Sequence, residues 1–262
     1  MTYETIRIEI DTRQVATVTL ARTAKHNAMD AVMIAELTAA AERLSKDDGV
    51  RIVVLKAEGK TFCAGGDLGW MRDQAEKDRQ GKMDEAMTLA RMLGLWNALP
   101  KPVIGRVHGA AYGGGLGLIC VCDIVIAEDT TRFALTETRL GLIPATIGPF
   151  VVGRLGEAFA RQVFFNAKPF DVDFLIRAGV VAGACPSTEL DAAVESEVAA
   201  LLLCAPGAVA DAKALCRALA GVNPVDAAGF SASALADRWE TQETRDGIAA
   251  FFAKEDPVWR RG

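Results

Sequence analysis

The chain opens with alternating hydrophobic and polar residues. Ile6, Ile8 and Ile10 alternate with charged side chains, and a second run rich in β-branched residues follows at 15–20. Alternation with a period of two is typical of a strand with one buried face. The two runs therefore predict an opening hairpin, which we expect to lead into a polar turn at 22–27.

A change of period after residue 30 predicts a helix. Ile34, Leu37, Ala41 and Leu44 recur every three or four residues, and Asp30 stands where an N-cap is needed. A second amphipathic helix is expected from about residue 82 to 99. Its predicted buried stripe consists of Met83, Ala86, Ala90, Leu93 and Trp96.

Further apolar runs predict additional strands and helices. Strands are expected at 52–56, 103–107, 123–127 and 132–135, and short helices at 68–71 and 116–122. Repeated strand, turn and helix units indicate an α/β fold whose strand ends build the site.

The composition changes from about residue 189, where an Ala-rich, strand-free sequence broken at Pro206 and Pro224 predicts about three helices. We therefore divide the chain into a core at 1–195, which carries the site, and a helical region at 196–262.

Two glycine-rich turns interrupt this pattern at strand ends. Residues 61–67 read Thr-Phe-Cys-Ala-Gly-Gly-Asp, and Gly113-Gly114-Gly115 follows the strand expected at 103–107. Free backbone N–H groups in such turns can bind an anion. Together the turns predict a pocket for negative charge that develops on an oxygen atom.

Composition narrows the possible partners. The chain has 262 residues, of which 51% are hydrophobic, enough for a buried core. A net charge of −5 argues against non-specific nucleic-acid binding, which needs a basic surface. Six cysteines without a C-x-x-C pair indicate reduced thiols and a cytoplasmic location. The charged, alternating first eleven residues lead us to expect neither a signal peptide nor a membrane span.

Motif searches exclude several chemistries. Two histidines and no Cys/His cluster argue against a metal site, and there is no G-x-S-x-G elbow, dinucleotide fingerprint or P-loop. Three carboxylates lie near the glycine turns. Asp67 is expected to cap a helix and Asp123 to serve as a structural partner. Glu137 lies among apolar residues, so we expect partial burial and a raised pKa suited to proton transfer.

The residues around these turns resemble the enoyl-CoA hydratase/isomerase (crotonase) superfamily. The similarity is specific at 62–68, 108–115 and 122–124, and it covers nearly the whole chain. Residues 22–28 look like that family's first coenzyme A loop, and residues 133–144 match its catalytic-acid segment. The resemblance implies a crotonase-like spiral of ββα units, a C-terminal helical trimerisation region, and a trimer or dimer of trimers.

The resemblance also implies roles for individual residues. The N–H groups of Ala64 and Gly114 would stabilise the thioester oxygen, with Glu137 as acid and base. Coenzyme A is part of the substrate, and neither a metal nor a further cofactor is expected. The implied substrate-binding residues are Ala24, Lys25, Ala28, Gly66, Asp67, Leu68, Trp70, Arg139, Phe251 and Lys254.

Some of these binding roles have alternatives. Arg139 could bind a distal carboxylate of the acyl group or form a structural ion pair. Phe251 and Lys254 match positions that often complete the nucleotide pocket of a neighbouring subunit, but Lys254 could equally lie on a solvated helix face.

The chain departs from the family pattern at one catalytic position. Typical hydratases hold a water between two glutamates; Glu137 matches the second, whereas Gly117 stands at the first. Residues 136–147 closely resemble bacterial methylglutaconyl-CoA and related branched enoyl-CoA hydratases, so we favour a hydratase. A Δ3,Δ2-enoyl-CoA isomerase, which needs only one base, stays open. A non-catalytic acyl-CoA-binding protein is the third hypothesis, and Glu137 counts against it.

Overall fold

The predicted opening hairpin is present in the computed structural model, which describes residues 3–260. Strand β1 (Ile6–Ile10) pairs antiparallel with β2 (Val15–Leu20), and β2 pairs parallel with β3 (Ile52–Ala57). The sheet runs in the order β1-β2-β3-β4-β6-β9, where the last three are β4 (Val103–Val107), β6 (Ile124–Glu128) and β9 (Gly183–Cys185). Because β2 to β9 are parallel, their carboxyl ends meet at one edge of the sheet.

A second, smaller sheet lies at this edge. It consists of β5 (Ala110–Tyr112), β7 (Arg132–Ala134) and β8 (Phe170–Asp171), in the order β5-β7-β8. Strand β5 leads directly into the second glycine turn, so the small sheet fixes where that turn begins. The sequence did not predict β5, β8 or β9, because strands of two or three residues carry no measurable alternation.

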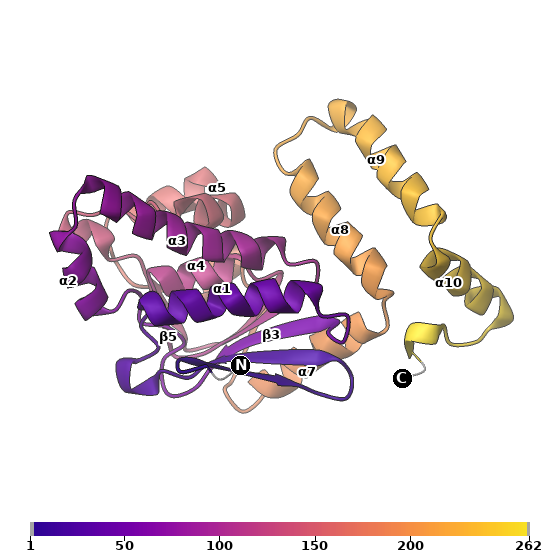
Figure 1. Cartoon of the computed structure of the whole chain (residues 1–262), viewed down its shortest axis with the longest axis horizontal. Helices are drawn as coiled ribbons and strands as arrows, with labels where there is room; N and C mark the ends of the chain where they lie inside the picture. Colours follow the sequence, from indigo (N-terminus) through magenta and orange to yellow (C-terminus); the bar gives the residue numbers. More distant parts are fainter. Residues whose placement is uncertain (1–2, 261–262) are drawn as a thin grey trace.

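Four helices cover one face of the large sheet (Figure 1). They are α1 (Ala31–Lys46), α3 (Arg79–Ala98), α4 (Gly114–Cys120) and α5 (Gly148–Phe164). In α1 the Asp30 side chain accepts a hydrogen bond from the Met33 N–H over 2.9 Å. The helix buries all four of its predicted core residues. The cap and the buried face of α1 are therefore confirmed.

The apolar stripe predicted for α3 is partly wrong. Its buried residues are Leu89, Met92, Leu93 and Trp96, whereas Met83 is 44% exposed. The amino-terminal half of α3 packs beside α2 (Leu68–Glu76) instead of over the sheet. Only the carboxyl-terminal half of α3 therefore enters the core.

The opposite face of the sheet is covered by α7 (Leu190–Leu202). Leu190, Val194 and Val198 are buried there against β3, β4 and β6. The predicted division at 195/196 falls inside this helix, and the division into domains stays a prediction. A further helix, α6 (Val172–Arg177), follows β8.

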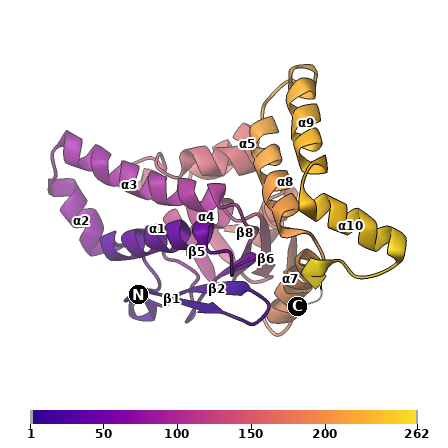
Figure 2. The ribbon, with the colours of Figure 1, turned by 45° about the vertical axis from the view of Figure 1, so that its right-hand side comes forward.

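Three helices extend beyond the core as an arm (Figures 1 and 2). They are α8 (Pro206–Leu219), α9 (Pro224–Trp239) and α10 (Gln242–Ala253). Within residues 189–260 there are thus four α-helices, not about three. Pro206 and Pro224 begin helices as expected, but Thr241 caps α10 without a proline to mark the break.

The remaining helical segments are short 3₁₀ turns, η1 (Thr23–Lys25), η2 (Glu137–Leu140) and η3 (Val258–Arg260). Within residues 3–260 no single helix is long and apolar enough to cross a membrane; α7 and α8 reach that length and composition only as a pair bent by 105°.

Candidate active site

The glycine-rich turn after β3 lies between two other segments of the chain. Cys63 forms a parallel bridge with Ala111 in β5, and Gly66 forms one with Met29, just before α1. Segments far apart in sequence thus meet at the carboxyl edge of the sheet. This arrangement places residues 63–66 next to the start of α4.

The N–H groups of Gly66 and Gly114 donate to no protein acceptor in the described chain. Gly114 is the first residue of α4, where the helix dipole is positive. By contrast, the Ala64 N–H donates to the His26 carbonyl over 3.0 Å. This contact contradicts the assignment of Ala64 as an oxyanion donor. Gly66, expected only to bind substrate, offers the free N–H instead.

The direction of the Gly66 N–H follows from its own peptide unit. The Gly65 carbonyl accepts a hydrogen bond from the Met29 N–H over 2.7 Å. A trans peptide is planar, so its C=O and N–H point in opposite directions. The Gly66 N–H therefore points away from Met29 and toward the pocket that Gly66 lines.

The Gly114 N–H is oriented in the same way. The Gly113 carbonyl accepts from the Leu116 N–H over 3.0 Å, and Gly113 has a φ of +47°, a conformation that favours glycine. A Cβ on Gly114 would lie only 2.5 Å from the Met29 Cε. A side chain at position 114 would therefore displace the end of the Met29 side chain.

Glu137, the first residue of η2, lies beside these donors. Its Oε1 is 3.2 Å from the position that a Cβ on Gly113 would occupy. Its Oε2 is buried and has no hydrogen-bond partner in the part of the chain that the structure describes. Burial raises the pKa of Glu137. A carboxyl group of this kind is suited to take up and release a proton.

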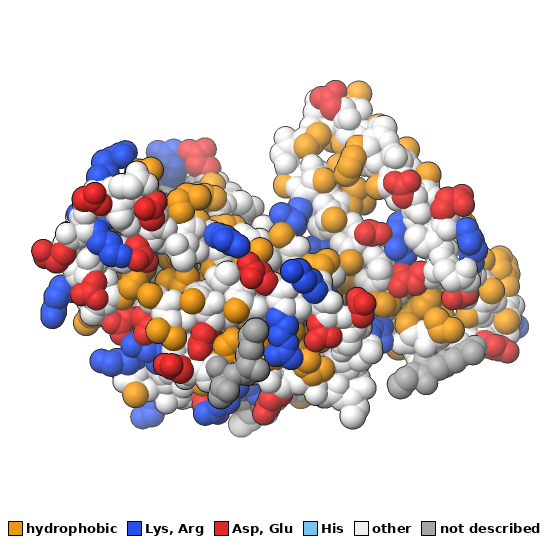
Figure 3. Space-filling view, viewed as in Figure 1, with side chains coloured by type: hydrophobic (Ala, Val, Ile, Leu, Met, Phe, Trp, Pro, Cys, Tyr) orange, Lys and Arg blue, Asp and Glu red, His pale blue; other side chains and the backbone are white. Residues whose placement is uncertain are grey.

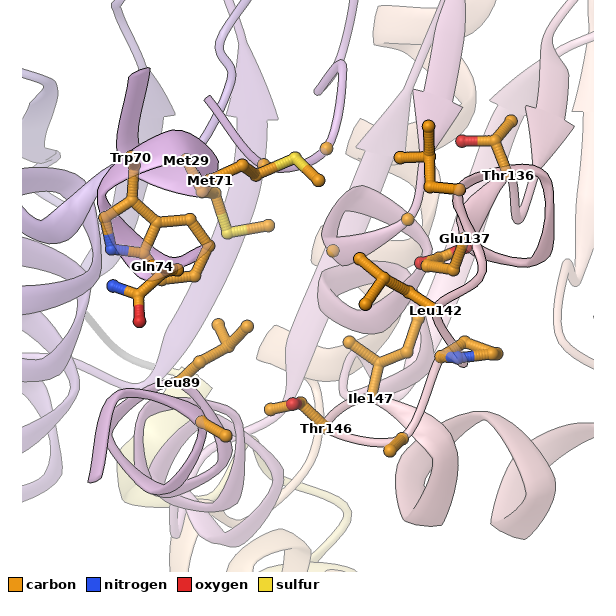
Figure 4. Close-up of a pocket in the computed structure, with 18 of the residues that line it drawn as sticks. Met29, Trp70, Met71, Gln74, Leu89, Thr136, Glu137, Leu142, Thr146 and Ile147 are labelled. Atoms are coloured by element: carbon orange, nitrogen blue, oxygen red, sulfur yellow. The ribbon is translucent and has the colours of Figure 1, made fainter. Parts of the chain in front are cut away.

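The donors and Glu137 open onto a cavity of about 430 Å³ (Figure 4). Helices α2 and α3 form one wall, and residues 136–147 form the other. Figure 4 shows Trp70, Met71 and Leu89 facing Leu142 and Ile147 across the cavity. The cavity is predominantly apolar, as suits an acyl chain.

Two charged side chains of α3, Lys82 and Glu85, also line the cavity. Neither residue belongs to a motif that the sequence makes visible. Glu85 forms an ion pair with Lys77, and this hydrogen bond lowers the pKa of Glu85. The two cavity carboxylates therefore differ, since the pKa of Glu85 is lowered whereas burial raises the pKa of Glu137.

The predicted substrate-binding residues fall into two groups. Gly66, Leu68 and Trp70 line the cavity. Ala24 and Lys25 are exposed on η1, and Ala28 is buried just after it; none of the three lines the cavity. Their roles toward coenzyme A stay predictions.

The remaining predicted binding residues lie away from the cavity of their own chain. Arg139 is exposed on η2 and is not a lining residue. Phe251 is 78% exposed on α10, and Lys254 caps the end of that helix. A role for the last two therefore requires a neighbouring subunit.

Asp67 has the structural role expected of a cap. Its Oδ1 accepts from the N–H groups of Gly69 and Trp70, and its Oδ2 accepts from Arg22 over 2.8 Å. The hydrogen bond from Arg22 lowers the pKa of Asp67. A direct role for Asp67 in substrate binding stays a prediction.

Position 117, where typical hydratases carry a glutamate, is closely packed. A Cβ on Gly117 would lie 2.8 Å from the Ile147 Cγ2 and 3.4 Å from the Leu93 Cδ1. A larger side chain therefore cannot fit without movement of Ile147. The site contains a single carboxylate beside the donors.

The described residues provide neither a metal-ligand cluster nor an ionised thiol at Cys63. Residues 3–260 contain no group of three His, Cys, Asp or Glu side chains that could hold a metal ion. Burial raises the pKa of the Cys63 thiol to about 12, so the thiol is neutral near pH 7. Cys63 is thus a packing residue. Asp123 is also structural, since it accepts from the Val103 N–H and pairs with Lys213.

Comparison with known proteins identifies the family. The model of the enoyl-CoA hydratase/isomerase family matches residues 11–262. The chain belongs to this family. It is 31% identical to "Probable enoyl-CoA hydratase echA8" of Mycobacterium tuberculosis over 98% of both chains. It is also 31% identical to "Probable enoyl-CoA hydratase" of Rhizobium meliloti, over 97% of each.

Solved structures give the same result for the fold. An enoyl-CoA hydratase from Shewanella pealeana is 37% identical, with a TM-score of 0.94 over 98% of this chain and 96% of that one. Pseudomonas aeruginosa AtuE is 34% identical, with a TM-score of 0.93 over 98% and 100%. The expected crotonase fold is therefore confirmed, and the chain is an enzyme of the enoyl-CoA hydratase/isomerase family.

Proposed function

We propose that the chain is an enoyl-CoA hydratase that adds water reversibly across the C2–C3 double bond of an acyl-CoA thioester. The observation that carries this proposal is the carboxylate of Glu137, with its buried and unpartnered Oε2, beside the free N–H groups of Gly66 and Gly114. These groups supply a base and an oxyanion hole at one point of the cavity. The hydratase names of the relatives support the same activity.

The reaction can be written with these groups alone. The Glu137 carboxylate removes a proton from water while the water oxygen bonds to C3, and the C2–C3 π electrons move toward the thioester oxygen. The N–H groups of Gly66 and Gly114 stabilise the resulting enolate; loss of one such donor typically costs roughly 3–4 kcal/mol. Glu137 then returns the proton to C2, so the product has gained one water and the enzyme is unchanged.

A Δ3,Δ2-enoyl-CoA isomerase is the second candidate, and Gly117 favours it. Without a second glutamate beside the donors, the simplest chemistry is transfer of one proton between C2 and C4. Glu137 would carry that proton, and the same two N–H groups would stabilise the dienolate. Hydratase and isomerase thus share every catalytic group and differ only in whether water enters.

The deciding experiment offers the purified protein 2-enoyl-CoA, 3-enoyl-CoA and 3-methylglutaconyl-CoA separately. Ultraviolet absorbance follows the conjugated thioester, and mass spectrometry identifies the product. From 2-enoyl-CoA or 3-methylglutaconyl-CoA we expect loss of conjugation with a mass gain of one water. Gain of conjugation at constant mass from the 3-enoyl substrate would establish the isomerase. Binding of all three without turnover would establish a non-catalytic acyl-CoA-binding protein.

We propose 3-methylglutaconyl-CoA as the first branched substrate to test, because residues 136–147 resemble hydratases of that class. Arg139 lies outside the cavity, so it is poorly placed to meet a distal carboxylate. Lys82 is the one lysine or arginine among the described cavity-lining residues. A carboxylate on the acyl group would therefore meet Lys82.

Coenzyme A recognition completes the proposal. The exposed Lys25 on η1 would bind a phosphate as a point charge, with Ala24 and Ala28 along the same loop. Phe251 and Lys254 would act on the nucleotide of a neighbouring subunit in a trimer or dimer of trimers. Coenzyme A belongs to the substrate, so the reaction requires no separate cofactor, and we propose a cytoplasmic location.

A further inference from the structure

Arg22 contacts both chain segments that meet at Gly66, namely residues 28–30 and Asp67. Its guanidinium donates to the Asp67 Oδ2 over 2.8 Å and to the Ala28 carbonyl over 3.0 Å, and it forms an ion pair with the Asp30 Oδ2 at 2.9 Å. The Arg22 and Asp67 side chains are only 21% and 14% exposed. Charge-assisted hydrogen bonds of this geometry are among the strongest in proteins.

These contacts surround an isolated bridge. Ala28 and Asp30 flank Met29 on one side of the Met29–Gly66 pair, and Asp67 follows Gly66 on the other. The bridge lies outside the named strands, so no neighbouring ladder pair within the described chain reinforces it. Beyond its own two backbone hydrogen bonds, the bridge is held by the side-chain contacts around it.

We propose that Arg22 is a positioning residue for the oxyanion hole. By holding residues 28–30 against Asp67, it keeps the Met29 bridge closed and thereby aims the Gly66 N–H at the thioester oxygen. This inference rests on the proposed acyl-CoA chemistry. Arg22 itself touches neither the thioester nor the reacting carbons.

The first test compares Arg22→Met with Arg22→Lys. Methionine keeps much of the side-chain length but donates no hydrogen bond, so the bridge can open and the Gly66 peptide can rotate. We expect kcat to fall roughly tenfold to hundredfold, less than the roughly 10²–10³-fold typical of losing a donor outright. The affinity for acyl-CoA should change little. Lysine, with one point charge instead of a planar fork, should restore activity only in part.

Asp67→Asn tests the same link from the other side. Asparagine still caps a helix, so α2 is retained, but the ion pair with Arg22 is lost. We expect a fall in kcat in the same direction as for Arg22→Met. If Arg22→Met does not fold, Arg22→Lys and Asp67→Asn carry the test.

Arg51 provides the matched control. Like Arg22, it links distant segments, by donating to the backbone carbonyls of Leu202, Cys204 and Trp259. Unlike Arg22, it precedes β3, at the amino end of the parallel strands. Arg51→Met should lower the melting temperature without lowering kcat per folded molecule. If Arg22→Met and Arg51→Met lower stability equally and neither changes kcat, Arg22 is merely structural.

A spectroscopic measurement reads the donor directly. In a Glu137→Gln background, where no turnover is expected, a conjugated dienoyl-CoA is bound and its ultraviolet absorption recorded. Hydrogen bonds to the thioester oxygen polarise the conjugated system, so the band should move to longer wavelength. We expect this shift to shrink when Arg22→Met is added and to persist when Arg51→Met is added.

The outcomes separate the two proposals. Absence of any binding or shift in the Glu137→Gln protein would remove the acyl-CoA site itself. A full shift that Arg22→Met and Asp67→Asn leave unchanged would overturn the role of Arg22 while the proposed function stands.

Discussion

In the proposed mechanism, the main chain at Gly66 and Gly114 supplies the oxyanion donors, not a side chain. Each N–H points toward the cavity because the carbonyl of its own peptide unit is already hydrogen-bonded. The donors therefore need no rearrangement when charge develops on the thioester oxygen. Preorganisation of this kind is usually the largest contribution to catalysis in such sites.

Replacing Glu137 by glutamine tests the single-carboxylate mechanism. Glutamine has almost the same shape but cannot accept or return the proton, so turnover should fall by at least roughly 10²-fold while acyl-CoA still binds. Steady-state kinetics and calorimetry measure the two effects. Glu85→Gln is the matched control, because Glu85 also lines the cavity but is paired with Lys77. Normal turnover in Glu137→Gln would remove the mechanism.

The raised pKa of Glu137 predicts the pH dependence of the reaction. The carboxylate must be ionised to act as a base, so kcat should fall as the pH drops through the pKa of Glu137. Because burial raises that pKa, this acid limb should lie above the value of about 4.3 expected for an exposed glutamate. A pH–rate profile measures it; a limb at or below that value would contradict the assignment.

The same shift predicts a change in stability. Above the folded-state pKa, Glu137 is charged in both states and only the folded state carries the cost of burial. As the pH falls through the raised pKa, the folded state takes up the proton first and this cost disappears. Relative to Glu137→Gln, the wild-type protein should therefore gain stability on acidification. Thermal melts of both proteins across pH provide the measurement.

At the scale of elements, the sequence predicted the hairpin, α1 and its cap because their periodicity is strong and local. It misplaced the buried stripe of α3, since only tertiary packing shows that α3 leaves the core beside α2. It left residues 148–182 unassigned, and it missed the break before α10, which Thr241 marks without a proline. Short strands and side-chain caps are thus where pattern alone fails.

The site was predictable for its residue types but not for its hydrogen bonds. The glycine turns and Glu137 come together as expected. The occupied Ala64 N–H and the free Gly66 N–H could not be told apart from sequence, because the difference depends on the His26 and Met29 backbone contacts. For the same reason Arg22, which looked like part of a polar turn, was not recognised.

Packing between α4 and α5 can be tested at Gly117. Alanine there would place a Cβ 2.8 Å from the Ile147 Cγ2, and overpacking of this kind typically costs about 1–3 kcal/mol. We expect Gly117→Ala to destabilise the wild-type protein. In an Ile147→Ala background, the effect of the same substitution should be neutral or favourable. A double-mutant cycle by chemical denaturation should give a coupling of about 0.5–3 kcal/mol.

Gly94 in α3 is the control for this cycle, because a Cβ there would meet nothing within 4 Å. Gly94→Ala should stabilise the protein by about 0.5–1 kcal/mol through helix propensity alone. Additive effects of Gly117→Ala and Ile147→Ala would show that the close contact does not restrict position 117.

At the scale of the whole molecule, the arm leaves apolar side chains uncovered. Phe230, Leu235 and Trp239 of α9 are 53%, 61% and 56% exposed. Figure 3 shows hydrophobic side chains at the surface of this part of the molecule. Leu235 and Trp239 are four residues apart and therefore share a face of α9. Exposed apolar patches commonly mark a protein interface. The proposed trimer would bury these side chains.

Light scattering coupled to gel filtration tests this assembly. We expect the mass of a trimer or hexamer for the wild-type protein. Phe230→Glu combined with Trp239→Glu should lower that mass, because burial of two charges at an apolar interface is unfavourable. The exposed pair Arg91 and Glu42 offers a control, Arg91→Ala, that should leave the mass unchanged. A stable wild-type monomer would contradict the proposed role of the arm.

The position of the two donors in the main chain has a consequence for protein engineering. Apart from proline, no substitution deletes a peptide N–H, whereas the walls of the cavity are made of side chains such as Leu89, Leu142 and Ile143. These residues can be enlarged or reduced to admit a different acyl group while the groups proposed to stabilise the enolate stay in place. Substrate preference in this scaffold can thus be redesigned separately from its chemistry.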